Sequence, residues 1–150
     1  MKVPYFLSIL IAGVIFFLCI IQIPDDVPPE FQIPYFDKIV HLLMYLGLTG
    51  MLFIENFKKK NGYTWKNVFL FLSGKITEAE THPVSGKSIA FFSLLSLFYG
   101  GLIEIIQEYF SQFRTGDGWD FFADTIGVLI AIGILLLTQR IRINHPATKM

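Results

Sequence analysis

Four long apolar stretches, separated by shorter polar segments, dominate the pattern of the chain. They are residues 3–23, 39–57, 89–110 and 121–138. A helix that crosses the hydrocarbon core of a bilayer needs about 20 mostly apolar residues, and a run of this length satisfies its own backbone amides there by forming a helix. The pattern therefore predicts an all-α membrane protein, a four-helix transmembrane bundle that forms one domain over residues 1–150.

Basic residues predict the orientation of this bundle, because cytoplasmic loops retain Lys and Arg. The connection 24–37 holds four acidic residues and no basic one, whereas the loop 58–88 holds six lysines. Of the twelve basic residues only Lys38 and Arg114 fall on the opposite side from that loop. We therefore expect the N- and C-termini and the loop 58–88 to be cytoplasmic, with the aromatic segment 63–72, which also carries Lys66, at the membrane surface.

Composition excludes several other classes of protein. Hydrophobic residues make up 53% of the 150 residues and charged residues 16%, whereas soluble domains carry roughly 25% charged residues. Twelve basic residues balance twelve acidic ones, so no basic excess favours nucleic acid as a partner. The single cysteine, Cys19, lies in an apolar run and excludes an internal disulfide.

Polar residues gather at one depth, near the same ends of the second, third and fourth predicted spans. They are Asp37, His41 and Tyr45 in the second span, Glu104, Gln107, Glu108 and Ser111 in the third, and Asp120 and Asp124 in the fourth. Within each span their spacing of three or four residues puts them on one helix face, and Gly127 continues the last of these faces. Charges cost about 2.5–3.5 kcal/mol at the bilayer centre, so we expect these faces to meet one another or a wet cavity at the outer leaflet.

Each of these residues also has a purely structural interpretation. Asp37 and Asp120 equally well mark helix ends at the interface, where Asp120 suits the positive end of a helix dipole. His41 taken alone is more often a hydrogen-bonded packing residue than a catalyst. Glu104 lies about two turns inside its helix end and is the strongest functional candidate. Arg114, in the outer loop, is the natural partner for these carboxylates or for an anionic ligand.

The order and spacing of these residues resemble the VanZ-like family. The matching positions are Asp37, Lys38, His41, Tyr45, Glu104, Gln107, Arg114, Asp120 and Gly127. The resemblance implies a small multi-pass protein of the bacterial inner membrane, in a family whose founding members are associated with resistance to teicoplanin-type glycopeptide antibiotics. Asp124 departs from the family pattern, which commonly has Asn there, and the added acidic group calls for a protonated carboxylate or a bound cation.

The first functional hypothesis is a site that binds, or binds and modifies, an amphiphile at the outer leaflet, such as a lipid-linked envelope precursor or a lipoglycopeptide. The ligand-binding candidates are Asp37, Lys38, His41, Tyr45, Glu104, Gln107, Arg114, Asp120 and Asp124. Catalysis, with His41, Glu104 and Asp37 as candidates for acid–base chemistry, is left open. The sequence contains no nucleophile elbow, H-x-x-x-H pair or glycine-rich phosphate loop, so we predict no metal and no cofactor.

Two alternatives belong to other classes. A proton- or ion-coupled transporter would explain carboxylates and a histidine inside the membrane. The inner half of the bundle offers only Glu55, however, and no inverted repeat is visible. A structural membrane subunit, whose polar cluster only locks the helices together, is the third hypothesis. A homo-oligomer is compatible with any of the three.

Overall fold

The computed structural model describes residues 5–20, 35–72, 82–110 and 118–144. These residues form the helices α1 (Phe6–Ile20), α2 (Phe36–Lys60), α3 (Trp65–Leu72), α4 (Gly86–Phe110) and α5 (Gly118–Asn144). No strand occurs in the described part of the chain, so the prediction of an all-α fold is confirmed.

Three helices, α2, α4 and α5, are long and apolar enough to cross a membrane. They contain the predicted spans 39–57, 89–110 and 121–138 and extend a few residues beyond most of their ends. Helix α1 covers 15 residues inside the predicted span 3–23, and the predicted residues before Tyr5 and after Ile20 lie outside the described part. Three span-length helices are therefore established, and the fourth crossing and the cytoplasmic location of the termini stay predictions.

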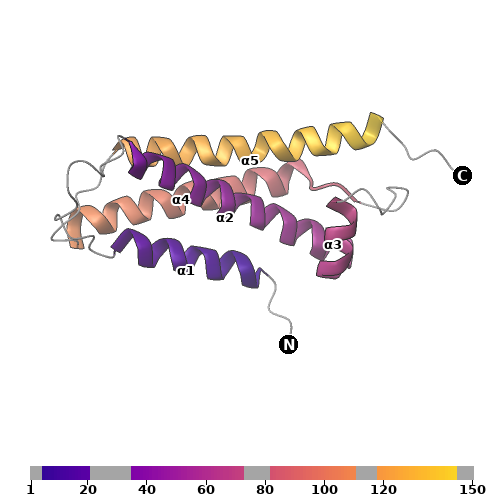
Figure 1. Cartoon of the computed structure of the whole chain (residues 1–150), viewed down its shortest axis with the longest axis horizontal. Coiled ribbons are helices and arrows are strands. Elements are labelled where there is room, and N and C mark those ends of the chain that lie inside the picture. The colour runs from indigo at the N-terminus through magenta and orange to yellow at the C-terminus, as the bar shows by residue number, and fades with distance from the viewer. Residues whose placement is uncertain (1–4, 21–34, 73–81, 111–117, 145–150) are drawn as a thin grey trace, which may run out of the picture.

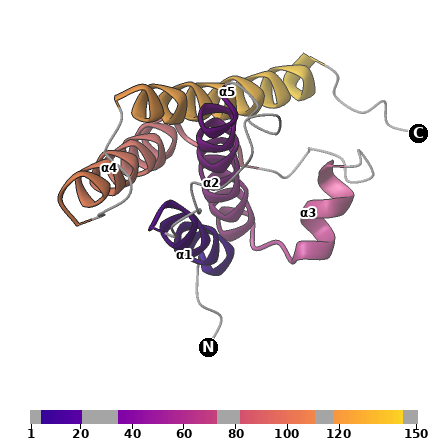
Figure 2. The same ribbon diagram turned by 60° about the vertical axis from the view of Figure 1, so that its left-hand side comes forward.

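Helix α2 is the centre of the arrangement and packs against α1, α4 and α5. Figure 1 shows that α2 and α5 run in the same direction, whereas α1 and α4 run in the opposite one. The view in Figure 2 shows α2 between α5 and α1, with α4 alongside. The buried apolar side chains in and around α2 include Ile15, Tyr45, Leu48, Leu52, Phe53, Phe92, Ile103 and Val128.

The outward faces of α1, α4 and α5 are apolar as well. Large side chains there stay exposed in the isolated chain, for example Phe17, Phe98 and Leu129 at 61%, 71% and 59%. A water-soluble protein rarely leaves so much contiguous apolar surface uncovered. Hydrocarbon is the solvent that suits these faces, which supports the lipid bilayer as the environment of the protein.

The segment after α2 turns sharply at Gly62. The amides of Gly62 and Tyr63 donate to the carbonyls of Lys59 and Lys58 at 3.4 and 2.9 Å, and Gly62 has a φ of 65°. This is a Schellman ending, in which glycine takes the left-handed conformation without a steric penalty. The chain then enters α3, so part of the predicted membrane-surface segment is helical, with the Lys58 ammonium 5.0 Å from the Trp65 ring centroid.

Both ends of α1 are held by side chains of other helices. The carboxylate of Glu55 in α2 accepts hydrogen bonds from the amides of Leu7 and Ser8, at 3.2 and 3.1 Å, and from the Ser8 hydroxyl at 2.6 Å. At the other end, Gln107 of α4 donates from Nε2 to the carbonyl of Cys19 at 2.9 Å. Helix ends leave such backbone groups unpaired, so these two contacts fix the position of α1 along the bundle.

Replacing Glu55 with Ala should therefore destabilise the protein, because three donors at the start of α1 lose their acceptor while Ser8 is only 2% exposed. We expect a loss of about 2–3 kcal/mol, measured as thermal or denaturant unfolding in detergent micelles. Lys66→Ala, at an exposed charged side chain of α3, is the control and should change stability by less than about 0.5 kcal/mol. Equal stability of the two variants would contradict the capping role.

Candidate functional site

The site begins with the close approach of α2 and α5 at Gly127. A Cβ atom at this position would collide with the carbonyl oxygen of Leu42 and would lie 3.0 Å from the amide nitrogen of Leu46. Only glycine lets two helix backbones come this near without displacing one of them. Gly127 therefore serves close packing of the two helices, and Ala131, 4% exposed and one turn further on, continues the same small-residue face.

Because α2 and α5 run in parallel, their first turns meet at one end of the bundle (Figure 1). The register is nearly constant, since Lys38 faces Asp120 and His41 faces Asp124. Asp37 and Asp120 lie in the first turns of their helices. Two helix N-termini side by side present unpaired amides and the positive ends of two helix dipoles, a setting that favours carboxylates.

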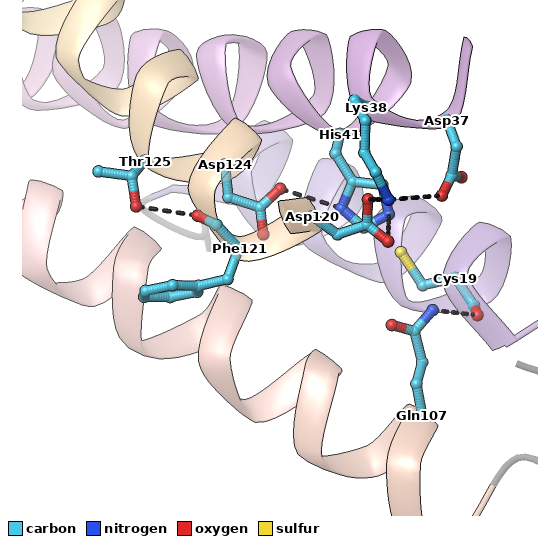
Figure 3. A network of polar contacts seen from close by, with 9 residues as sticks. All are labelled: Cys19, Asp37, Lys38, His41, Gln107, Asp120, Phe121, Asp124 and Thr125. Atoms are coloured by element: carbon cyan, nitrogen blue, oxygen red, sulfur yellow. Dashed lines mark hydrogen bonds and ion pairs between the residues drawn. The ribbon is translucent and has the colours of Figure 1, made fainter. Parts of the chain in front are cut away.

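The polar side chains of α2 and α5 form one connected network, which Figure 3 shows from close by. The Lys38 ammonium donates to Asp120 Oδ1 and lies 3.8 Å from Asp37 Oδ2. Nδ1 of His41 lies 3.0 Å from Asp124 Oδ1, and Nε2 of the same ring lies 4.0 Å from Asp120 Oδ2. His41 therefore stands between the two aspartates of α5.

Helix α4 closes the network from a third side. A Cβ atom at Gly100 would lie 2.9 Å from Asp124 Oδ2 and 3.2 Å from Cε1 of Tyr45, so the absent side chain lets α4 approach both residues. One turn later, Glu104 offers a carboxylate oxygen within 4.8 Å of ligand atoms of His41 and Asp124. The polar cluster, as we call it below, consists of Asp37, Lys38, His41, Tyr45, Glu104, Asp120 and Asp124.

The polar cluster contains buried oxygens that have no hydrogen-bond partner among the described residues, and two of them belong to almost fully buried side chains. They are Oδ2 of Asp124 and the hydroxyl of Tyr45, in side chains that are 1% and 0% exposed. Buried polar atoms in native proteins are almost always hydrogen-bonded to protein, water or a ligand. The two oxygens therefore mark a place where a bound group would be favourable.

The polar cluster also carries an excess of negative charge. It contains four carboxylates, those of Asp37, Glu104, Asp120 and Asp124, against the one ammonium of Lys38 and the imidazole of His41. Buried charges are stable only when they are paired and hydrogen-bonded. Protons, a cation or a cationic group of a ligand would each offset the surplus.

The structure brings together seven of the nine predicted ligand-binding residues, and their role in binding stays a prediction. Gln107 is different, because it is 2% exposed and its amide is bonded to the carbonyl of Cys19. Arg114, the predicted partner of the carboxylates, lies outside the described residues, as does Ser111, and Glu108 is exposed. Within the described part, Lys38 is the cation that pairs with a carboxylate of the cluster.

Two residues that shape this region were not identified as such from the sequence. Gly100 permits the approach of α4. The sequence feature that could have identified it is the Gly100–Gly101 pair one turn before Glu104, because small residues mark helix contacts in membranes. Glu55 caps the start of α1. The sequence feature that could have identified this role is its position inside an apolar span, where a carboxylate requires a partner.

The model of a protein family described as VanZ/LLP1 matches residues 5–139. The matched range runs from the start of α1 through most of α5 and contains every residue of the polar cluster. Neither the curated proteins nor the solved structures give a significant match.

Replacement of Gly127 by Ala should separate α2 from α5, because the added methyl group meets backbone rather than a movable side chain. We expect a loss of about 1–3 kcal/mol in unfolding free energy, typical of overpacking at a tight contact. Gly133→Ala is the matched control, since a Cβ at Gly133 meets nothing within 4 Å. It should leave stability unchanged or raise it slightly. A Gly127→Ala protein as stable as the control would refute the tight contact.

The Lys38–Asp120 pair should show energetic coupling in a double-mutant cycle of Lys38→Met and Asp120→Asn. Lys38→Met alone leaves the carboxylate of Asp120, whose side chain is 7% exposed, without its ammonium partner, whereas the double variant removes both charges. Because the Lys38 side chain is 27% exposed, solvent screens the pair and we expect a coupling of about 1–2 kcal/mol. Additive losses of stability across the cycle would show that the two charges act independently.

Proposed function

Because the chain belongs to the VanZ/LLP1 family, we propose that the polar cluster binds the headgroup of an amphiphile at the outer leaflet of a bacterial inner membrane. A lipid-linked envelope precursor or a lipoglycopeptide of the teicoplanin type has the required chemistry, a polar headgroup joined to an acyl or polyprenyl chain. The observation that carries the proposal is the convergence of seven polar residues from three apolar helices at one end of the bundle.

The depth of the cluster suits a headgroup. His41 lies five residues after the start of α2 and Asp124 six residues after the start of α5. At a rise of 1.5 Å per residue, both lie roughly 8–9 Å inside the helix ends. The neighbouring outer surface is apolar, with Ile105 and Phe122 each 55% exposed. A headgroup at the cluster could therefore keep its hydrocarbon chain in the lipid beside α4 and α5.

The distribution of basic residues supports the outer leaflet. Helix α2 ends with Lys58, Lys59 and Lys60, at the end of the bundle opposite the polar cluster, and α3 follows there with Lys66. Figure 1 places α3 beside the end of α2 and far from its start. Since cytoplasmic ends are the basic ones, the lysine-rich end belongs in the cytoplasm and the polar cluster belongs on the outer side.

The chemistry of the cluster suits a headgroup with hydroxyl or cationic groups, which its surplus of carboxylates can bind, together with an anionic group near Lys38. Lys38 is its partly exposed cation, with a side chain 27% exposed, and could contact a phosphate or carboxylate. His41 donates from Nδ1 to ionised Asp124 in one tautomer, which orients the ring and leaves Nε2 as a proton acceptor. This is how a carboxylate prepares a histidine for general-base chemistry, so modification of the bound amphiphile is the natural extension of binding.

Trp119 provides the test, because it adjoins Asp120 and is 68% exposed. In a Trp65→Phe background it is the only tryptophan of the chain. Titration of this protein in nanodiscs with a lipid-linked envelope precursor, and separately with teicoplanin, should give a saturable change in Trp119 fluorescence. Lys38→Met and His41→Ala should weaken binding about tenfold or more, because each removes a charged or hydrogen-bonding contact.

Lys58→Met removes the same charge at the opposite end of α2 and is the matched control. It should leave binding unchanged. The proposal would be wrong if no amphiphile gave a saturable change, or if Lys58→Met weakened binding as much as Lys38→Met. Size-exclusion profiles of all variants would show that the comparison is made between folded proteins.

One observation favours a second candidate, a proton-coupled transporter. Beyond Tyr45 on α2, the buried hydroxyl of Thr49 donates to Ser96 of α4 at 2.9 Å, and Glu55, 6% exposed, lies further along the same helix. These groups extend polarity from the cluster toward the opposite end, as proton relays do. Proton flux into liposomes without any amphiphile, abolished by Thr49→Val, would favour this function over the first.

A further inference from the structure

We propose that His41, Glu104 and Asp124 form a site for one divalent transition-metal cation of the Zn²⁺ type. The three residues come from α2, α4 and α5, and each offers one ligand atom within 4.8 Å of the others. A metal there would join the three span-length helices at one point. The site shares its residues with the polar cluster of the proposed function, but metal binding requires no amphiphile and can be tested without one.

The distance between the first two ligand atoms already suits a metal. Nδ1 of His41 and Oδ1 of Asp124 are 3.0 Å apart. Zn²⁺ binds nitrogen and oxygen at about 2.0–2.2 Å in tetrahedral geometry, so two adjacent ligands of one ion lie roughly 3.3–3.5 Å apart, and the pair needs to separate by only a few tenths of an ångström. The Glu104 carboxylate is the third ligand of the set, and Gly100, one turn earlier, lets α4 approach Asp124.

A second, independent observation points to a bound group in the same place. Oδ2 of Asp124 and the hydroxyl of Tyr45 are buried without hydrogen-bond partners among the described residues. Both groups flank the same position, since the Cβ point at Gly100 lies 2.9 Å from Asp124 Oδ2 and 3.3 Å from Cζ of Tyr45. A bound metal would give both oxygens a partner. Oδ2 would be a further ligand of the metal, and the phenol would form a hydrogen bond with a water bound to the metal.

The surroundings of the other imidazole nitrogen fit metal ligation as well. A histidine that ligates a metal almost always donates its second ring N–H to a carboxylate, a backbone carbonyl or water. Nε2 of His41 faces Asp120 Oδ2 at 4.0 Å, and Asp120 is held in place by Lys38. This distance is longer than a hydrogen bond, so Asp120 would act as a positioning residue through the negative charge that it places beside the second N–H of His41.

A competing group of three residues, Asp37, His41 and Asp120, is also close enough to hold a metal. There, however, the Lys38 ammonium already lies between the carboxylates, bonded to Asp120 and 3.8 Å from Asp37. A divalent cation would have to displace this charge. Asp124 contacts no lysine or arginine within the described residues, so the Glu104 side of His41 is the favourable one.

The donor set selects the class of metal. One imidazole and two carboxylates suit borderline cations such as Zn²⁺, Mn²⁺ or Fe²⁺, whereas Mg²⁺ and Ca²⁺ prefer oxygen ligands alone. A divalent cation would also offset the excess of carboxylates in the polar cluster. Hydrogen bonding of Asp124 to His41 without metal is the alternative, and it leaves Asp124 Oδ2 and the Tyr45 hydroxyl unsatisfied.

Zinc binding by the metal-stripped protein in detergent tests the proposal. The chain has three histidines, so a His82→Ala/His145→Ala background makes His41 the only imidazole. Competition with a chromophoric chelator should then show one Zn²⁺ per chain, with excess Mg²⁺ unable to displace it. Glu104→Gln and Asp124→Asn should each weaken zinc binding about tenfold or more, whereas Asp37→Asn should change it less than about twofold.

Nitrogen NMR of the His41 ring in the same background measures zinc binding at the ring itself and does not require a substitution in the polar cluster. Zinc should shift the Nδ1 resonance in proportion to occupancy, and Glu104→Asp, which keeps a carboxylate, should retain the shift if Glu104→Gln fails to fold. Absence of stoichiometric zinc binding and of a His41 shift would overturn the proposal. Loss of zinc binding in Asp37→Asn with retention in Glu104→Gln would overturn this ligand set. Amphiphile binding measured with a chelator present tests the proposed function separately.

Discussion

The backbone contact between α2 and α5 at Gly127 is the constraint on which the rest of the structure depends. It sets the distance and the register of two parallel helices, and the register in turn places Lys38 against Asp120 and His41 against Asp124. Parallel packing also brings two helix N-termini together, so their dipoles favour the carboxylates that gather there. A bulkier residue at position 127 would act on the polar network through the helices that carry it.

The membrane explains why so many side chains of this bundle serve backbone groups or one another. Within hydrocarbon an unpaired polar group finds no water to bond with. The unpaired backbone groups at the ends of α1 are therefore hydrogen-bonded by Glu55 and Gln107 of neighbouring helices. The same requirement holds for the polar cluster, whose surplus of carboxylates demands compensation. A site that must attract a cation, a proton or a ligand group to be stable is well suited to binding.

The sequence predicted the positions of the span-length helices and the depth of the polar residues, because apolar run length and helical spacing are local properties. It did not predict which polar groups pair, since the rotation of each helix depends on its neighbours. Gln107 has the spacing of a site residue but bonds to the backbone of Cys19. Lys38 and Asp120 are 82 positions apart, and their pairing emerges only when Gly127 fixes the register of α2 and α5. Glu55 likewise gains its role only when α1 is placed beside it.

Asp124 shows how one acidic group can change the character of such a site. The resemblance to the VanZ-like family implies Asn at this position, a neutral side chain whose amide both donates and accepts hydrogen bonds. Asp124 is 1% exposed and uses one oxygen on His41, so its second oxygen adds an acceptor and a charge without adding a donor. An ionised carboxylate there strengthens the hydrogen bond to the imidazole, and it raises the demand for a positive partner on the α4 side. The substitution therefore favours a bound cation or proton in this chain more than an asparagine would.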